Sequence, residues 1–267
     1  MISGELEQDS VKTSKDGSVL RVALNRPEMH NALNPEMIGA LTSLFRDLSQ
    51  RDHVRVVVLT GNGRSFCAGA DLVSMRAASD LAFDQNLAGG KAIFDLMQEI
   101  DKCPKPVIGR INGAAIGGGM GLVSCCDITI AVNEAKFGFS EARLGLVPAV
   151  ISPFVLAKIG ERYGRELFLT GERFDAYHAW EIGLIQHVVT REELDAKVNE
   201  RVQQLLLAAP GAQAAAKELI RTVSRQPKHD SRSFTARMIA QRRASAEGRE
   251  GMSAFLEKRK PEWQVEK

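Results

Sequence analysis

Apolar and polar positions change period several times along the first 190 residues, as they do where strands and helices alternate. Residues 19–25 (VLRVALN) alternate between apolar and polar side chains, which is typical of a half-buried strand. Residues 54–61 (VRVVVLTG) are almost continuously apolar, as in a parallel strand that is buried on both faces. Between them, Asn34 and Pro35 suit the cap and the first position of a helix. Further strands are expected at residues 105–111, 127–132 and 183–190, and a long helix at residues 81–101.

The pattern becomes wholly helical after the last of these strands. Residues 191–257 keep helical spacing and are interrupted at Pro210 and Pro227. Strands that alternate with helices, followed by helices alone, predict an α/β fold with a helical appendage. We therefore expect a core of residues 1–195 and a C-terminal helical region of residues 196–267.

Composition and charge bear on whether the protein binds nucleic acid. The chain has 267 residues, of which 44% are hydrophobic, and a net charge of +2. Residues 217–243 hold eight basic side chains against two acidic ones, which we interpret as a solvated helix face, with a phosphate-attracting surface as the alternative. The weak net charge and the lack of interleaved aromatic residues argue against a nucleic-acid-binding protein.

The cysteines and histidines give no sign of a metal site or of a disulfide framework. The four cysteines lack CxxC spacing and the five histidines are scattered. The first residues are polar and contain acids, unlike a signal or transit peptide, and no apolar run reaches the length of a membrane span. We therefore expect a cytoplasmic protein with reduced thiols, no metal and no membrane contact.

Three adjacent glycines, Gly117 to Gly119, separate a predicted strand from a helix that is expected to begin at about Gly118. The segment lacks the lysine of a phosphate-binding P-loop, and Leu122 breaks the GxGxxG spacing of a dinucleotide site. The N–H groups in the first turn of a helix are free to donate, and glycine has no side chain to keep a ligand oxygen away from them. Such a site suits an oxyanion. Close packing of the helix against the strand also favours glycine and is the alternative explanation.

A second small-residue turn follows the strand at residues 54–61. Its sequence SFCAGADL bends at Gly69, which is flanked by Ala68 and Ala70. Two such turns can aim two N–H groups at one carbonyl oxygen, as the stabilisation of a thioester enolate requires.

Five segments together resemble the enoyl-CoA hydratase/isomerase family, also called the crotonase superfamily, over residues 10–260. The resemblance implies a spiral of β-β-α units followed by C-terminal helices that mediate trimerisation, with hexamers also common. It implies an acyl-CoA thioester substrate and no further cofactor, because coenzyme A is part of that substrate. The segments, in chain order, are NRPEMHNALN, SFCAGADL, GAAIGGGMGL with CDITIA, FGFSEARLGLVP and LTGERFDAYHAWEIGLI.

The resemblance also implies roles for particular residues. The oxyanion donors are the N–H groups of Ala70 and Gly118, and Phe255 and Lys258 are candidates for contacts to coenzyme A in a neighbouring subunit. The remaining coenzyme A contacts would come from Met29, His30, Ala32, Ala68, Asp71 and Leu72.

The catalytic carboxylates depart from the commonest family pattern. Hydratases of the family often use two glutamates around one water, in GGGxE and FGxxE segments. Here the first position is Gly121, whereas the second is Glu141. We expect burial among Phe137, Phe139, Leu144 and Leu146 to raise the pKa of the Glu141 carboxyl.

One carboxylate can add water across a double bond, or it can move a proton between two carbons. Chemistry alone slightly favours the second reaction, isomerisation, because hydration gains from a second group that positions water. Residues 145–155 (GLVPAVISPFV) instead resemble a subgroup without the first glutamate that hydrates branched and carboxylated enoyl-CoAs. We therefore expect a hydratase, with an isomerase, an RNA-binding protein or an inactive member as alternatives.

Overall fold

A six-stranded sheet lies at the centre of the computed structural model, which describes residues 10–71, 74–76 and 81–264. Its strand order is β1-β2-β3-β5-β7-β10, and every neighbouring pair except the β1–β2 hairpin is parallel. The strands are β1 (Val11–Asp16), β2 (Val19–Leu24), β3 (Val56–Gly61), β5 (Val107–Ile111), β7 (Ile128–Val132) and β10 (His187–Val189). All but β1 lie within the segments that the hydrophobic pattern predicts.

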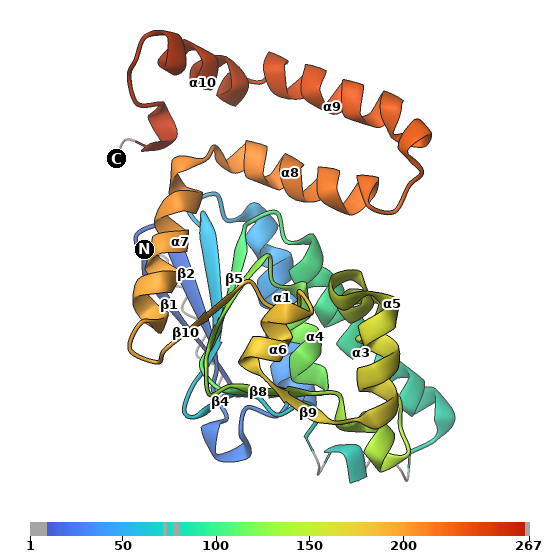
Figure 1. The fold of residues 1–267 in the computed structure, drawn as a ribbon. Coiled ribbons are helices and arrows are strands. Elements are labelled where there is room, and N and C mark those ends of the chain that lie inside the picture. Colours follow the sequence, from blue (N-terminus) through green and yellow to red (C-terminus); the bar gives the residue numbers. More distant parts are fainter. Residues whose placement is uncertain (1–9, 72–73, 77–80, 265–267) are drawn as a thin grey trace.

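A second sheet of four short strands lies beside the first (Figure 1). The turns at Gly69 and at residues 117–119, the glycine turns, each follow one of its strands. The order of this sheet is β4-β6-β8-β9, and β4, β6 and β8 run parallel. Because parallel strands end at the same edge of a sheet, the segments that leave these three strands meet there. The strands are β4 (Ser65–Cys67), β6 (Ala114–Ile116), β8 (Lys136–Gly138) and β9 (Arg173–Asp175).

The two sheets are linked by a repeated unit. A strand of the large sheet is followed by a strand of the small sheet and then by a helix, in β3-β4-α3, β5-β6-α4 and β7-β8-α5. This order confirms the expected spiral of β-β-α units. The helices are α1 (Pro35–Asp47), α3 (Phe83–Lys102), α4 (Gly118–Cys125), α5 (Ser152–Thr170), α6 (Ala176–Glu181) and α7 (Leu194–Leu207).

Local sequence explains where several helices begin and bend. The Asn34 side chain accepts a hydrogen bond from the Met37 N–H at 2.9 Å and so caps α1, which Pro35 begins. Helix α5 is kinked at Gly160, whose φ of 71° leaves the helical region. Helix α4 is apolar on all sides and buried from Gly119 to its end, which fixes its first turn in place.

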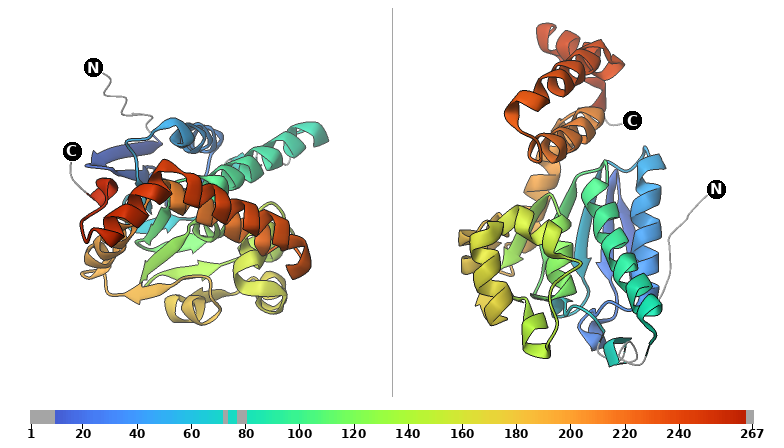
Figure 2. Two further views of the ribbon diagram at one scale, coloured as in Figure 1. Left: turned by 90° about the horizontal axis from the view of Figure 1, so that it is seen from above. Right: turned by 90° about the vertical axis from the view of Figure 1, so that its right-hand side faces the viewer.

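Three further helices form a C-terminal arm, which we define as α8 (Pro210–Val223), α9 (Ser231–Ala244) and α10 (Ala246–Leu256). The arm extends beyond one end of the sheets, and only α8 faces the core (Figures 1 and 2). Arg55 holds its base by donating to the Ala208 carbonyl at 2.7 Å, and Lys217 pairs with Asp127 at 2.6 Å. Within the described ranges, no helix is both long enough and apolar enough to cross a bilayer.

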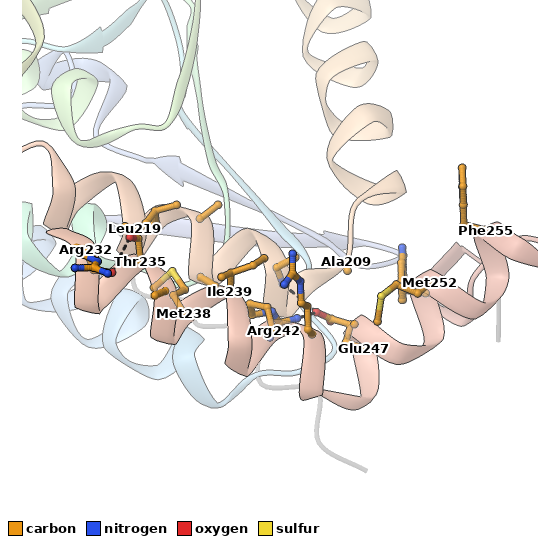
Figure 3. A pocket seen from close by; sticks show the side chains of 18 residues that line it. Ala209, Leu219, Arg232, Thr235, Met238, Ile239, Arg242, Glu247, Met252 and Phe255 are labelled. Carbon is orange, nitrogen blue, oxygen red and sulfur yellow. Dashed lines mark hydrogen bonds and ion pairs between the residues drawn. The ribbon is translucent and has the colours of Figure 1, made fainter. Parts of the chain in front are cut away.

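An open apolar groove of about 1080 Å³ lies between the helices of the arm (Figure 3). Leu219 of α8, Ile239 of α9 and Met252 of α10 line it, and Phe255 lies at one end. The Phe255 side chain is 83% exposed. The helices that form the groove lie at the opposite end of the molecule from β8 and β9 (Figure 1).

Candidate active site

The turn after β4 leaves the Ala70 amide facing away from its neighbouring segment. Leu33 donates to the Gly69 carbonyl at 2.7 Å and accepts from the Asp71 N–H at 3.1 Å, so it pairs with the residues on either side of Ala70. In a parallel bridge, the N–H of the middle residue then points to the opposite side. Ala70 itself is exposed. Its N–H is therefore available to a ligand.

The turn after β6 brings a second amide to the same place. Gly117, with a φ of 50°, donates to the Gly138 carbonyl at 2.9 Å, and Gly118 begins α4. The Gly118 N–H belongs to the first helical turn, where N–H groups have no partner within the helix. A Cβ atom added to Gly118 would lie 3.8 Å from the Ala70 nitrogen, and one added to Gly69 would lie 3.3 Å from the Gly118 nitrogen. The two amides are thus close enough to donate to one oxygen.

Close backbone packing explains why glycine recurs in both turns. A Cβ atom on Gly69, whose φ is 92°, would lie 2.7 Å from the Ile116 carbonyl oxygen. A Cβ atom on Gly119 would lie 2.3 Å from the Cys67 carbonyl oxygen. Both explanations drawn from the sequence therefore apply, because the packing that requires glycine is also what places the two amides side by side.

The Glu141 carboxylate lies next to these amides. Glu141 belongs to the 3-10 helix η3 (Ser140–Leu144) that follows β8, and its Oε1 lies 3.1 Å from where a Cβ atom on Gly117 would be. Its Oε2 is buried and has no hydrogen-bond partner among the described residues. Burial raises the pKa of the Glu141 carboxyl above its ordinary value of 4.5. The carboxyl group therefore has one buried oxygen without a hydrogen-bond partner among the described residues, beside the turns at Gly69 and Gly117.

The direction of this pKa shift agrees with the sequence, but two of the four expected neighbours do not contribute to the burial. Phe137, in β8, and Phe139, directly after it, are fully buried. Leu144 and Leu146 are 58% and 48% exposed, because the chain turns outward after Glu141. Of the four expected neighbours, only Phe137 and Phe139 are therefore buried.

Four of the residues expected to contact coenzyme A lie together beside the Ala70 turn. The Ala68 N–H donates to the His30 carbonyl at 2.9 Å, which joins the two loops. Met29 and Ala68 are exposed, His30 is half-buried and Ala32 is buried. Of these, Ala32 presents no exposed side chain for a ligand. Leu72 lies outside the described residues.

The side chain of Asp71 is used inside the protein. Its carboxylate is buried, pairs with Arg26 at 2.9 Å and accepts from the Ser74 N–H at 3.0 Å. Arg26 also donates to the Ala32 carbonyl at 2.7 Å. The pair therefore ties the loop that precedes α1 to the Ala70 turn, and a ligand would meet the backbone of Asp71 rather than its carboxylate.

Sequence reasoning missed Arg26 and Asn31 as residues that organise these loops. Asn31 is fully buried with a φ of 57°, accepts from the Arg26 N–H at 2.9 Å and donates to the Ser65 carbonyl at 2.9 Å. Both residues lie within the NRPEMHNALN motif. The signal was a strongly polar motif between two apolar elements, which we interpreted only as a ligand contact.

Phe255 and Lys258 lie in or just after α10, at the opposite end of the molecule from β8 and β9 (Figures 1 and 2). The fold of one chain does not bring them to Ala70, Gly118 or Glu141. Both are exposed. A role at a site of this kind would require a second copy of the chain.

Other candidate groups have structural roles. Lys217, in the basic stretch, binds Asp127 and the Lys105 carbonyl, so it stabilises the arm. Burial raises the pKa of the Cys67 thiol to about 12, which leaves it protonated and unreactive at neutral pH. The part of the chain that the structure describes contains no cluster of three or more His, Cys, Asp or Glu side chains arranged to hold a metal ion.

Comparison with known proteins places this chain in a family. The profile of the enoyl-CoA hydratase/isomerase family matches residues 14–266. Enoyl-CoA hydratase AKT6-1 of Alternaria alternata is 35% identical over 92% of this chain and 81% of its own length. Carnitinyl-CoA dehydratase of Escherichia coli O157:H7 is 34% identical over 96% of this chain and 98% of its own.

Solved structures agree with the sequence comparison. An enoyl-CoA hydratase from Shewanella pealeana superposes with a TM-score of 0.93 at 37% identity, covering 97% of each chain. AtuE of Pseudomonas aeruginosa superposes with a TM-score of 0.93 at 34% identity, covering 96% of this chain and all of that one. The chain is an enzyme that belongs to the enoyl-CoA hydratase/isomerase family, whose members act on acyl-CoA thioesters.

Proposed function

We propose that this enzyme adds water across the 2,3-double bond of a 2-enoyl-CoA thioester. The observation on which the proposal rests is the pair of amides, Ala70 and Gly118, beside the Glu141 carboxylate, whose buried Oε2 has no hydrogen-bond partner among the described residues. The thioester carbonyl oxygen would accept hydrogen bonds from both N–H groups. Negative charge that develops on that oxygen is then stabilised by donors that are already in place.

Glu141 would act as both base and acid. The carboxylate accepts a proton from water while the water oxygen bonds to C3, and the electron pair of the double bond moves toward the thioester as an enolate. The protonated Glu141 then donates that proton to C2, and the carbonyl reforms. Water is thus added with no other reactant. Burial moves the pKa of the Glu141 carboxyl toward neutral pH, and a group that both accepts and donates a proton works best when its pKa is near the working pH.

Gly121 specifically favours a second candidate function, isomerisation of a 3-enoyl-CoA to a 2-enoyl-CoA. In this reaction Glu141 removes a proton from C2 and returns it to C4, so one carboxylate suffices. The names of the hydratase and dehydratase relatives support hydration as the first choice. Both reactions pass through an enolate held by the same two amides.

We further propose that coenzyme A lies along Met29, His30, Ala68 and the backbone of Asp71, all beside the Ala70 turn. Phe255 and Lys258 would contact coenzyme A bound to a second copy. The apolar groove of the arm supports a trimer or hexamer, because an exposed apolar surface of this kind marks an association site. We place the reaction in the cytoplasm, as four free, buried thiols favour, and propose no metal or further cofactor.

A thioester assay tests the proposed function directly. With crotonyl-CoA and then with branched 2-enoyl-CoAs, we expect the absorbance of the conjugated thioester to fall as water is added. With a 3-enoyl-CoA, isomerisation would first raise that absorbance. Mass spectrometry of the products separates a gain of water from a change of bond position. Unchanged substrate in every case would contradict both candidate reactions.

The pH dependence follows from the raised pKa of Glu141. The carboxylate is the form that accepts the proton, so activity falls as pH decreases through this pKa. Because burial raises the pKa in the free enzyme, the acidic limb of kcat/KM against pH should lie above 4.5 rather than at it. A limb at or below 4.5, measured where the protein stays folded by circular dichroism, would show that an unperturbed carboxyl carries the proton.

A further inference from the structure

Gly121 is in the first turn of α4, four residues after Gly117, the residue that precedes the helix and that the Glu141 carboxylate overlies. A side chain at residue 121 would therefore begin about one turn from the proposed proton carrier. The chain between Glu141 and α5 is short and folds back on itself, since the Leu146 N–H donates to the Glu141 carbonyl at 3.0 Å. This geometry brings residues 150–151 against the same helix.

Two buried side chains fill the space that residue 121 would need. A Cβ atom on Gly121 would lie 2.5 Å from Ile151 Cγ2, 2.9 Å from Met97 Cε and 3.1 Å from Met97 Sδ. Carbon atoms in contact are normally about 3.5–4.0 Å apart. Met97 is 0% exposed and Ile151 is 2% exposed, so neither has open solvent to move into.

The two blocking residues are held by their own elements. The Ile151 carbonyl accepts from the Phe154 and Val155 N–H groups at 3.1 Å each, which fixes Ile151 at the start of α5. Phe94, one turn before Met97 on α3, packs against Phe154 with ring centroids 5.4 Å apart. Helices α3 and α5 thus contact each other through Phe94 and Phe154, which limits how far Met97 and Ile151 can move apart.

We propose that Met97 and Ile151 keep this site to a single carboxylate, because they fill the space that an acidic side chain at residue 121 would need. The inference rests on the proposed function and extends it. Glu141 alone would then hold the water molecule that adds to the double bond. The same site both hydrates 2-enoyl-CoA and moves the double bond of 3-enoyl-CoA, because each reaction needs only the proton that Glu141 transfers.

A double-mutant cycle on thermal stability tests the steric part. Gly121→Ala should lower Tm by roughly 3–10 °C, because it overpacks a closed site. In an Ile151→Ala background the same change should lower Tm by less than half as much. The matched control is Gly39→Ala in α1, where a Cβ atom meets nothing within 4 Å, and Tm should hold or rise. Equal effects of Gly121→Ala in both backgrounds would overturn the proposed exclusion.

A kinetic comparison tests the consequence for specificity. Wild-type enzyme should convert both 2-enoyl-CoA and 3-enoyl-CoA. In the Ile151→Ala background, Gly121→Glu should raise the ratio of hydration to isomerisation about tenfold, whereas the uncharged Gly121→Gln should not. A ratio unchanged by Gly121→Glu in a folded, active double variant would overturn the inference. Wild-type enzyme that converts neither substrate would instead overturn the proposed function. The double-mutant cycle on Tm would still test whether Ile151 and Met97 exclude a side chain at residue 121.

Discussion

Replacing Glu141 with glutamine is expected to lower kcat on a 2-enoyl-CoA by about 10²–10⁴-fold, with a much smaller change in KM. Glutamine keeps the size of the side chain but can neither accept the water proton nor return it to C2. Because the two amides are unchanged, thioester binding should survive. The loss of rate therefore belongs to the proton-transfer step. Single-turnover stopped-flow kinetics should show the slower proton transfer directly.

The matched control is Glu161→Gln, which makes the same chemical change on the exposed face of α5, where Glu161 pairs with Arg165 at 2.8 Å. Exposed pairs of this kind contribute at most about 1 kcal/mol, so activity should be unchanged. If Glu141→Gln retained a tenth or more of the wild-type kcat, another group would have to carry the proton.

The large sheet and the helices could be predicted because their segments are long enough to show a period. Residues 19–25 and 54–61 cover β2 and β3, and the interruption expected at Pro210 separates α7 from α8. Strand β1 was missed because only Val11 of its six residues is buried, so it has no alternation. It forms because the edge of β2 needs a hydrogen-bonding partner.

The small sheet could not be predicted for a different reason. Its strands, such as β4 and β6, have three residues each, which is too short for any period to be visible. Yet this sheet aligns the Ala70 turn, the Gly118 turn and Glu141 at one edge. The sequence indicated which groups are chemically suited to the site, whereas their convergence depends on pairings between strands that are far apart in the chain.

The polar groups that support the site could not be predicted from the sequence for a third reason. Asp71 resembles a ligand contact in sequence, but its carboxylate is neutralised by Arg26 inside the protein. Only the packing of two loops distinguishes a buried ion pair from an exposed acid. The closure of the space at Gly121 by Ile151, thirty positions later, is hidden in the same way.

Gly69→Ala is the second change with a large expected effect, a loss of about 10²-fold in kcat with the fold retained. A Cβ atom at residue 69 would lie 2.7 Å from the Ile116 carbonyl oxygen and 3.3 Å from the Gly118 nitrogen. The β4 turn must therefore move away from α4, which separates the Ala70 amide from the Gly118 amide. Loss of one oxyanion donor typically lowers kcat by about 10²–10³-fold.

Backbone strain has to be separated from this displacement, because Gly69 has a φ of 92° that alanine disfavours. Gly17→Ala is the matched control: its φ of 55° imposes strain of the same kind in the β1–β2 turn, but a Cβ atom there meets nothing within 4 Å. Both variants should lose some thermal stability, and only Gly69→Ala should lose kcat. Equal kcat in the two variants would mean that the amide pair does not stabilise the transition state, since strain alone would then account for every effect of the substitution.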